Sequence, residues 1–150
     1  MIKQKNLSET KIQNILEEYL KEKGWKITNE DGIHRHGCDI TAWHSVKRKN
    51  LFIEIKGGGA HEVQMKHNGF WTLLGQILSR MDIEGNNLKK GRIYAIAIPQ
   101  EWEKTFTDKI RKMSFGWKLL KLRVFLVDSN FVVTEKSYSK FLKKDLKKKV

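Results

Sequence analysis

Two short segments of the chain carry the side chains best suited to chemistry. The first, residues 37–41, contains Asp39, and fifteen positions after Asp39 comes the tripeptide Glu54-Ile55-Lys56. Both segments are rich in β-formers, so we expect two strands in which alternate side chains share a face. Glu54 and Lys56 then point the same way, and pairing of the strands brings Asp39 beside them. The spacing predicts two carboxylates and one ammonium on one surface.

This grouping has a defined chemical use. Two carboxylates and the backbone carbonyl of Ile55 can hold Mg²⁺ through hard oxygen ligands, and Mn²⁺ can take the same ligands. An ammonium beside the metal can orient the attacking water or neutralise charge that develops on a phosphate. We therefore expect Asp39, Glu54 and Ile55 as metal ligands and Lys56 as a catalytic cation. An isolated Glu-X-Lys on a strand more often marks a solvated face, so the upstream aspartate strand favours the chemical interpretation.

The arrangement resembles the PD-(D/E)XK nuclease superfamily, which includes restriction endonucleases and Holliday-junction resolvases. Asp39 matches the aspartate of the motif, and Glu54-Ile55-Lys56 matches its E-X-K tripeptide. Cys38 stands where the motif usually has proline, at a position that is not a metal ligand. The resemblance covers roughly residues 8–100 and implies a shared fold with metal-dependent phosphodiester hydrolysis.

Two further residue types match auxiliary positions of that superfamily. Many members carry a glutamate on the first helix near the metal, and Glu9, followed by Gln13, fits this role better than Glu17 or Glu18. A glutamine on the helix after the E-X-K strand often lies beside the site, and Gln76 matches it. The resemblance therefore adds Glu9 and Gln76 to the expected catalytic residues.

The charge of the chain indicates a polyanionic partner. Lys and Arg number 30 against 17 acidic residues, which gives a net charge of +13 and points to DNA. A basic loop can bind phosphates or can simply be a solvated turn, and charge alone does not distinguish the two. Large aromatic residues can stack on bases but more often belong to the core. We expect DNA contacts from Lys47, Arg48, Lys49, Trp43, His61 and Lys66. A transition-metal or general-base role for His34, His36 or His44 is less favoured, because no helical His-x-x-x-His pair occurs.

Hydrophobic periodicity predicts the elements that must position these residues. We expect helices over 8–23, 62–82 and 101–113, and strands over 25–28, 37–43, 51–56, 93–98, 122–128 and 131–134. The first three strands read as an antiparallel meander, and the continuously apolar 93–98 reads as a central strand. The sequence predicts an α/β fold of restriction-endonuclease-like type, with a mixed central sheet flanked by helices in the order αβββαβ, then a helix and C-terminal strands.

The whole chain sets further bounds. Its 150 residues suit a single domain over 1–150, with a basic tail at about 143–150. It has one cysteine, no apolar stretch long enough for a membrane span and no secretion signal, so we expect a cytoplasmic protein without disulfides. We expect a Mg²⁺-dependent endonuclease, or alternatively an inactive nucleic-acid-binding module of the same fold. A homodimer or a partner protein could supply specificity.

Overall fold

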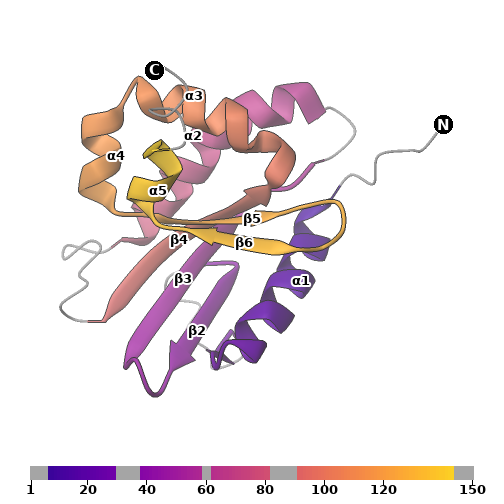
Figure 1. Cartoon of the computed structure of the whole chain (residues 1–150), viewed down its shortest axis with the longest axis vertical. Coiled ribbons are helices and arrows are strands. Elements are labelled where there is room, and N and C mark those ends of the chain that lie inside the picture. Colours follow the sequence, from indigo (N-terminus) through magenta and orange to yellow (C-terminus); the bar gives the residue numbers. More distant parts are fainter. Residues whose placement is uncertain (1–6, 30–37, 59–61, 82–90, 144–150) are drawn as a thin grey trace.

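A six-stranded sheet runs through the described part of the molecule in the order β1-β2-β3-β4-β5-β6 (Figure 1). The computed structural model describes residues 7–29, 38–58, 62–81 and 91–143, without the side chains of 62–66 and 142–143. The strands are β1 (Lys26–Ile27), β2 (Ile40–His44), β3 (Lys49–Ile55), β4 (Arg92–Pro99), β5 (Arg123–Val127) and β6 (Val133–Lys136).

The sheet is mixed, as the sequence predicts. Strands β1, β2 and β3 form an antiparallel meander, β4 runs parallel to β3 and β5, and β6 is antiparallel to β5. Every residue of β4 after Arg92 is buried, which fits its central place and confirms the prediction for 93–98. The parallel pairs require crossovers, and helices provide them.

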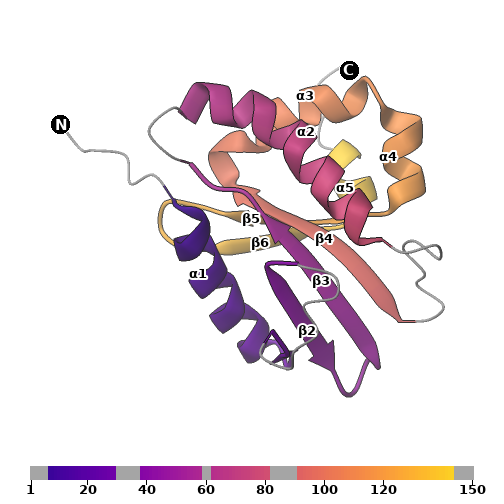
Figure 2. The ribbon, with the colours of Figure 1, turned by 180° about the vertical axis from the view of Figure 1, so that it is seen from behind.

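Helices cover both faces of the sheet (Figures 1 and 2). Helix α1 (Glu9–Glu22) packs on one face, against alternate residues of β4 such as Ala95 and Ala97. The intervening residues, such as Tyr94 and Ile96, face the other core. That core is closed by α2 (Glu62–Arg80), α3 (Glu103–Arg111), α4 (Ser114–Leu120) and α5 (Tyr138–Lys143). The predicted α/β class and element order are confirmed, with two short helices added.

The ends of α1 follow from local chemistry. The Ser8 side chain accepts a hydrogen bond from the Lys11 N–H at 3.2 Å, which satisfies one of the free donors of the first turn. At the other end Gly24 takes a φ of +91°, which glycine adopts without a Cβ penalty. The predicted helix over 8–23 is therefore confirmed, with each end placed to within one residue.

The predicted final strand, 131–134, is displaced by two residues from β6, which spans Val133–Lys136. Strand β6 begins at Val133, because the Asp128 carboxylate accepts hydrogen bonds from the N–H groups of Asn130 and Val132 at 2.8 and 2.9 Å. These bonds wrap the intervening residues into a loop in which Phe131 has a φ of +66°. The connection between β5 and β6 therefore spans residues 128–132 and is longer than the predicted strands 122–128 and 131–134 allow.

Helices α4 and α5 were not predicted. They span only seven and six residues, too few for a periodic apolar pattern. Tertiary contacts define them instead, since the buried rings of Trp117 in α4 and Phe141 in α5 lie 6.1 Å apart. The expected helix over 101–113 is also divided, into a 3-10 turn η2 (Gln100–Trp102) and α3. Residues 144–150 of the expected basic tail lie outside the described part of the chain.

Candidate active site

The register of β2 and β3 brings the two motif carboxylates together. Ile40 pairs with Ile53, so the residue before Ile40 lies opposite the residue after Ile53, which places Asp39 beside Glu54. The Ile55 N–H donates to Asp39 Oδ2 at 2.7 Å, which fixes the orientation of that carboxylate. In a strand the N–H and C=O of one residue point to the same side, so the Ile55 carbonyl also faces Asp39.

A network from α1 and β1 holds the Asp39 backbone in place. The side-chain amides of Gln13 and Asn29 both donate to the Asp39 carbonyl, each at 3.3 Å. The same two amides donate to Glu17 Oε1 at 3.1 Å, and Asn29 Oδ1 accepts from the Thr41 N–H at 2.6 Å. Glu17 therefore acts through Gln13 and Asn29 rather than at the carboxylates. Sequence reasoning did not single out Asn29, whose role depends on contacts far apart in the chain.

Glu54 is a buried acid with an arginine partner. Its side chain is 3% exposed, and Arg80, at the end of α2, contacts Glu54 Oε1 through Nε at 3.1 Å. Burial, and then the negative charge of Asp39, raise the pKa of Glu54 to about 7, while the hydrogen bond from Arg80 opposes that shift. No sequence motif marked Arg80, because it lies 26 residues from Glu54.

Cys38 adjoins this acidic cluster. Burial, followed by the negative charge of Glu54, raises the pKa of the Cys38 thiol to about 12. The thiol of the metal-free protein is therefore neutral at physiological pH, which disfavours a role as nucleophile.

Lys56 lies just beyond the end of β3, which ends at Ile55, one residue earlier than the predicted strand 51–56. Its N–H donates to the Ala97 carbonyl at 3.0 Å, which continues the pairing with β4. The ammonium is 3.7 Å from Glu9 Oε1, so its ion pair is with α1 rather than with Glu54. The contact depends on Gly57, where an added Cβ would lie 2.5 Å from the backbone nitrogen of Glu9.

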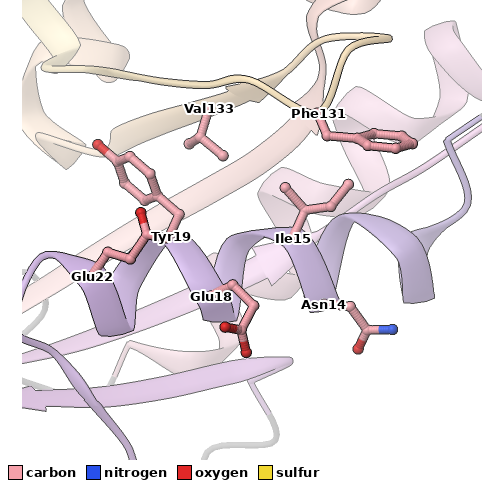
Figure 3. A pocket seen from close by; sticks show the side chains of 7 residues that line it. All are labelled: Asn14, Ile15, Glu18, Tyr19, Glu22, Phe131 and Val133. Atoms are coloured by element: carbon pink, nitrogen blue, oxygen red, sulfur yellow. The ribbon is translucent and has the colours of Figure 1, made fainter.

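The structure distinguishes the three candidate glutamates of α1. Glu9 contacts Lys56, whereas Glu17 belongs to the hydrogen-bond network around Asp39. Glu18 pairs with Lys21 at 3.3 Å and lines a groove between α1 and the β5–β6 hairpin (Figure 3). None of the expected catalytic residues lines that groove. Glu9 is therefore the helix-1 glutamate that the structure places at the E-X-K segment.

Gln76 lies one helical turn before Arg80 on α2, so both side chains share the face that meets Glu54. Its Oε1 atom is buried and has no hydrogen-bond partner. A buried acceptor without a partner costs free energy, and such an atom is a ready ligand for a donor that enters the site. The helical glutamine expected from the resemblance thus lies on the same face of α2 as Arg80, which contacts Glu54.

The donor set suits a hard divalent cation. Asp39 and Glu54 supply carboxylate oxygens, the Ile55 carbonyl faces the same side, and the Gln76 oxygen lacks a partner. Mg²⁺ is held in proteins by one or two carboxylates with water and phosphate completing its shell. The described residues contain no cluster of three or more His, Cys, Asp or Glu side chains that could hold a metal. Oxygen ligands such as these suit Mg²⁺ or Mn²⁺ better than zinc, which favours His and Cys ligands.

The expected DNA-contact residues do not gather at the carboxylates. Lys47 and Arg48 are exposed and Lys49 is half-buried in the β2–β3 hairpin, at the opposite end of these strands from Asp39 and Glu54 (Figure 1). Trp43 shares the face of Asp39 but lies about 13 Å along the strand from it. The hairpin and Trp43 thus form a separate surface, at the end of β2 and β3 away from the carboxylates.

The remaining expected contacts involve mostly undescribed residues. His61, His34 and His36 lie outside the described residues, as does the Lys66 side chain on α2. His44 is described and is buried, with Nδ1 accepting from the Lys47 N–H at 3.1 Å. This bond links the His44 ring to the β2–β3 hairpin.

Comparisons with known proteins bear on the fold. No protein-family profile matches the chain, and no curated protein matches its sequence. Among solved structures, an XisH family protein from Nostoc punctiforme is similar, with a TM-score of 0.55 over 84% of this chain and 97% of that one. The two chains are 19% identical, so the likeness shows a common fold alone. Within the described residues, none of the helices has the length and apolar character that a bilayer span needs.

Proposed function

We propose that this protein is a Mg²⁺-dependent nuclease of the PD-(D/E)XK superfamily, which cleaves DNA as an endonuclease in the cytoplasm. The proposal depends above all on Asp39 and Glu54, which meet at neighbouring strand ends with the Ile55 N–H bonded to Asp39 Oδ2 at 2.7 Å. Two carboxylates and an adjacent carbonyl make the oxygen ligand set that Mg²⁺ takes, and Mn²⁺ can replace it.

Each nearby side chain has a part in this chemistry. Bound Mg²⁺ would polarise the phosphodiester and lower the pKa of a water molecule. Asp39 and Glu54 would hold the ion at a fixed point, because Gln13 of α1 and Asn29, which follows β1, both bond to the Asp39 carbonyl. The Lys56 ammonium donates to the attacking water or to a phosphate oxygen, and Glu9 at 3.7 Å sets its direction.

An inactive DNA-binding module of the same fold is the second candidate. One observation favours it, since Arg80 already occupies Glu54 with a contact of 3.1 Å, which neutralises an acid that a working centre would use for metal. The high positive charge would then bind DNA without cutting it. Binding to DNA with no metal-stimulated turnover is the result that selects this candidate.

Cleavage of labelled single-stranded, duplex, flapped and four-way DNAs tests the choice. The protein is incubated with Mg²⁺, Mn²⁺ or EDTA, beside the variants Asp39→Asn and Glu54→Gln. We expect cleavage only with metal and a loss of about 100-fold or more in each variant. The control is Glu18→Gln, which changes a glutamate on the groove side of α1. Full activity in Asp39→Asn would refute the proposal.

Double-strand cleavage also needs a second active site. Two copies of this chain would place one site on each strand, whereas a single copy would nick. A partner protein could equally bring specificity to a domain of this size. Light scattering of the protein alone and on duplex DNA distinguishes these arrangements, and nicking by a monomer would argue against a homodimer.

A further inference from the structure

We propose that Arg80 is an exchangeable counter-cation, which holds Glu54 in the metal-free protein and transfers to a DNA phosphate when metal binds. The inference rests on the proposed function and adds to it a device that couples metal loading to substrate binding at the same site. It is carried by the contact between Arg80 and Glu54 and by the charges around it.

In this contact the positive charge of Arg80 takes the place that a metal ion would have beside Glu54. Glu54 is 3% exposed, and a buried carboxylate requires a cation or strong donors to offset its lost hydration. Arg80 provides this through Nε alone, at 3.1 Å from Oε1. Lys56, the other cation of the motif, pairs with Glu9 instead. Within the described chain, Arg80 is thus the cation that contacts the buried acid.

The charges do not allow Arg80 to stay when metal arrives. Asp39 and Glu54 together carry two negative charges and Arg80 carries one positive charge. A divalent cation between the two acids would already balance them, and it would repel a guanidinium held on the same carboxylate. Glu54 Oε1 would also have to serve both partners. Metal binding therefore favours the release of Arg80.

The position of Arg80 permits this release. It is the last residue of α2, its side chain is 33% exposed, and within the described residues it bonds to Glu54 through Nε. The two terminal nitrogens of the guanidinium make no hydrogen bond within the described residues. A guanidinium binds phosphate through two parallel N–H donors, so the freed side chain suits a phosphate next to the metal.

Metal binding without DNA tests the first half of the exchange. Mn²⁺ affinity is measured by electron paramagnetic resonance at about pH 8.5, where carboxylates are ionised, for the parent, Arg80→Gln and Arg80→Lys. Removing the competing cation should tighten Mn²⁺ binding by about tenfold in Arg80→Gln, with Arg80→Lys in between. The matched control is Arg123→Gln, which removes an arginine of similar exposure from its ion pair with Glu135, and the Mn²⁺ affinity of this variant should not change.

DNA binding with Ca²⁺, as a metal that supports little cleavage, tests the second half. The parent should gain affinity for duplex DNA when Ca²⁺ is added, and Arg80→Gln should lose about tenfold of that gain. Unchanged or weaker Mn²⁺ binding in Arg80→Gln would overturn the exchange. If Arg80→Gln does not fold, as judged by circular dichroism, Arg80→Lys decides, since a lysine that matched the parent in both assays would exclude a guanidinium-specific transfer.

The two proposals fail in different ways. Failure of the parent to bind Mn²⁺ would overturn both the nuclease function and the exchange. Metal-dependent cleavage by the parent, with Mn²⁺ affinity unaltered in Arg80→Gln, would leave the nuclease function intact and remove only the role of Arg80. The readout by Mn²⁺ affinity needs no catalytic activity.

Discussion

The carboxyl group of Glu54 is buried beside Asp39, and its pKa in the folded protein is raised from 4.5 to about 7. The folded state therefore keeps a proton that the unfolded chain releases between these values. Glu54 contributes its full stabilisation below pH 4.5, and this contribution is lost as the pH rises to about 7. In EDTA, we expect the free energy of unfolding to fall over this interval by up to about 3 kcal/mol relative to Glu54→Gln.

Urea unfolding at a series of pH values measures this difference. The Glu54→Gln side chain stays neutral, so subtracting its pH profile isolates the proton on Glu54. Glu18→Gln serves as the control, because its side chain is 73% exposed and should not alter the profile. Parallel curves for the parent and Glu54→Gln would show that Glu54 ionises as it does in solvent.

The side chain of Gln76 lowers the stability of the metal-free protein. Its buried Oε1 lacks a hydrogen-bond partner, and an unsatisfied buried acceptor costs about 1–3 kcal/mol. The change Gln76→Met removes the acceptor and keeps a similar volume, so we expect the melting temperature of the metal-free protein to rise while cleavage falls. Thermal unfolding and the cleavage assay are read on the same sample. A lower melting temperature would mean that the amide stabilises the protein by bonds of its own.

At the residue scale, the sequence predicts those contacts that follow from the geometry of paired strands. The alternation of side chains and the fifteen-residue spacing suffice to place Asp39 beside Glu54. Arg80 could not be found in this way, since its contact depends on how α2 is rotated on the sheet. The pairing of Lys56 with Glu9 likewise depends on the approach of α1, which no local pattern encodes.

At the scale of the elements, the start of α1 packs closely against the chain that follows β3. Gly57 packs against the α1 backbone, where an added Cβ would meet the Glu9 nitrogen at 2.5 Å and the Leu7 carbonyl at 2.7 Å. Backbone atoms do not give way easily, so Gly57→Ala should move α1 from the sheet. We expect a loss of about 1–3 kcal/mol of stability and a separation of Glu9 from Lys56.

Gly75→Ala is the matched control for that change. Gly75 lies within α2 and an added Cβ there has no neighbour within 4 Å, so alanine should stabilise the helix by about 1 kcal/mol. Urea unfolding compares the two variants, and the cleavage assay reports whether Glu9 still supports Lys56. Equal stability of Gly57→Ala and the parent would contradict the close packing of α1 on β3.

Helices and strands with a clear apolar pattern were predicted from the sequence. Elements whose formation depends on tertiary packing were not. Helix α1 and the buried β4 have long apolar patterns with clear ends, and both were predicted. Helices α4 and α5 are defined by Trp117 and Phe141, which enter the core from distant segments. Strand β6 was displaced because the Asp128 side chain, rather than residue propensity, sets the length of the preceding loop.

At the scale of the whole molecule, the basic β2–β3 hairpin lies apart from the candidate site at Asp39 and Glu54. The net charge is +13, yet within the described chain the cations that pair with acids of the candidate site are Arg80, with Glu54, and Lys56, with Glu9. The exposed lysine and arginine of the β2–β3 hairpin lie at the far end of the strands. A long duplex can contact both regions, since a turn of B-DNA spans about 34 Å.

This separation predicts which lysines and arginines bind DNA. Contacts with DNA phosphates release counterions, so the affinity for duplex DNA should fall steeply as salt rises. In a plot of log affinity against log salt concentration, each contacted phosphate contributes about −0.9 to the slope. If the hairpin grips the backbone, the double change Lys47→Gln with Arg48→Gln should reduce the slope by about 2. Fluorescence anisotropy at several salt concentrations gives the slope for the parent and variant.

A second double variant separates local contact from total charge. Lys104→Gln with Lys140→Gln removes the same charge from exposed positions on α3 and α5, on the face of the sheet opposite α1. If DNA responds only to net charge, the two double variants will weaken binding equally and their slopes will match. A reduced slope in the hairpin variant alone means that Lys47 and Arg48 contact phosphates, and the duplex then runs along β2 and β3 toward Asp39 and Glu54. Equal slopes would make the hairpin a solvated turn and would leave the DNA path to be sought around α2, where Arg80 ends the helix.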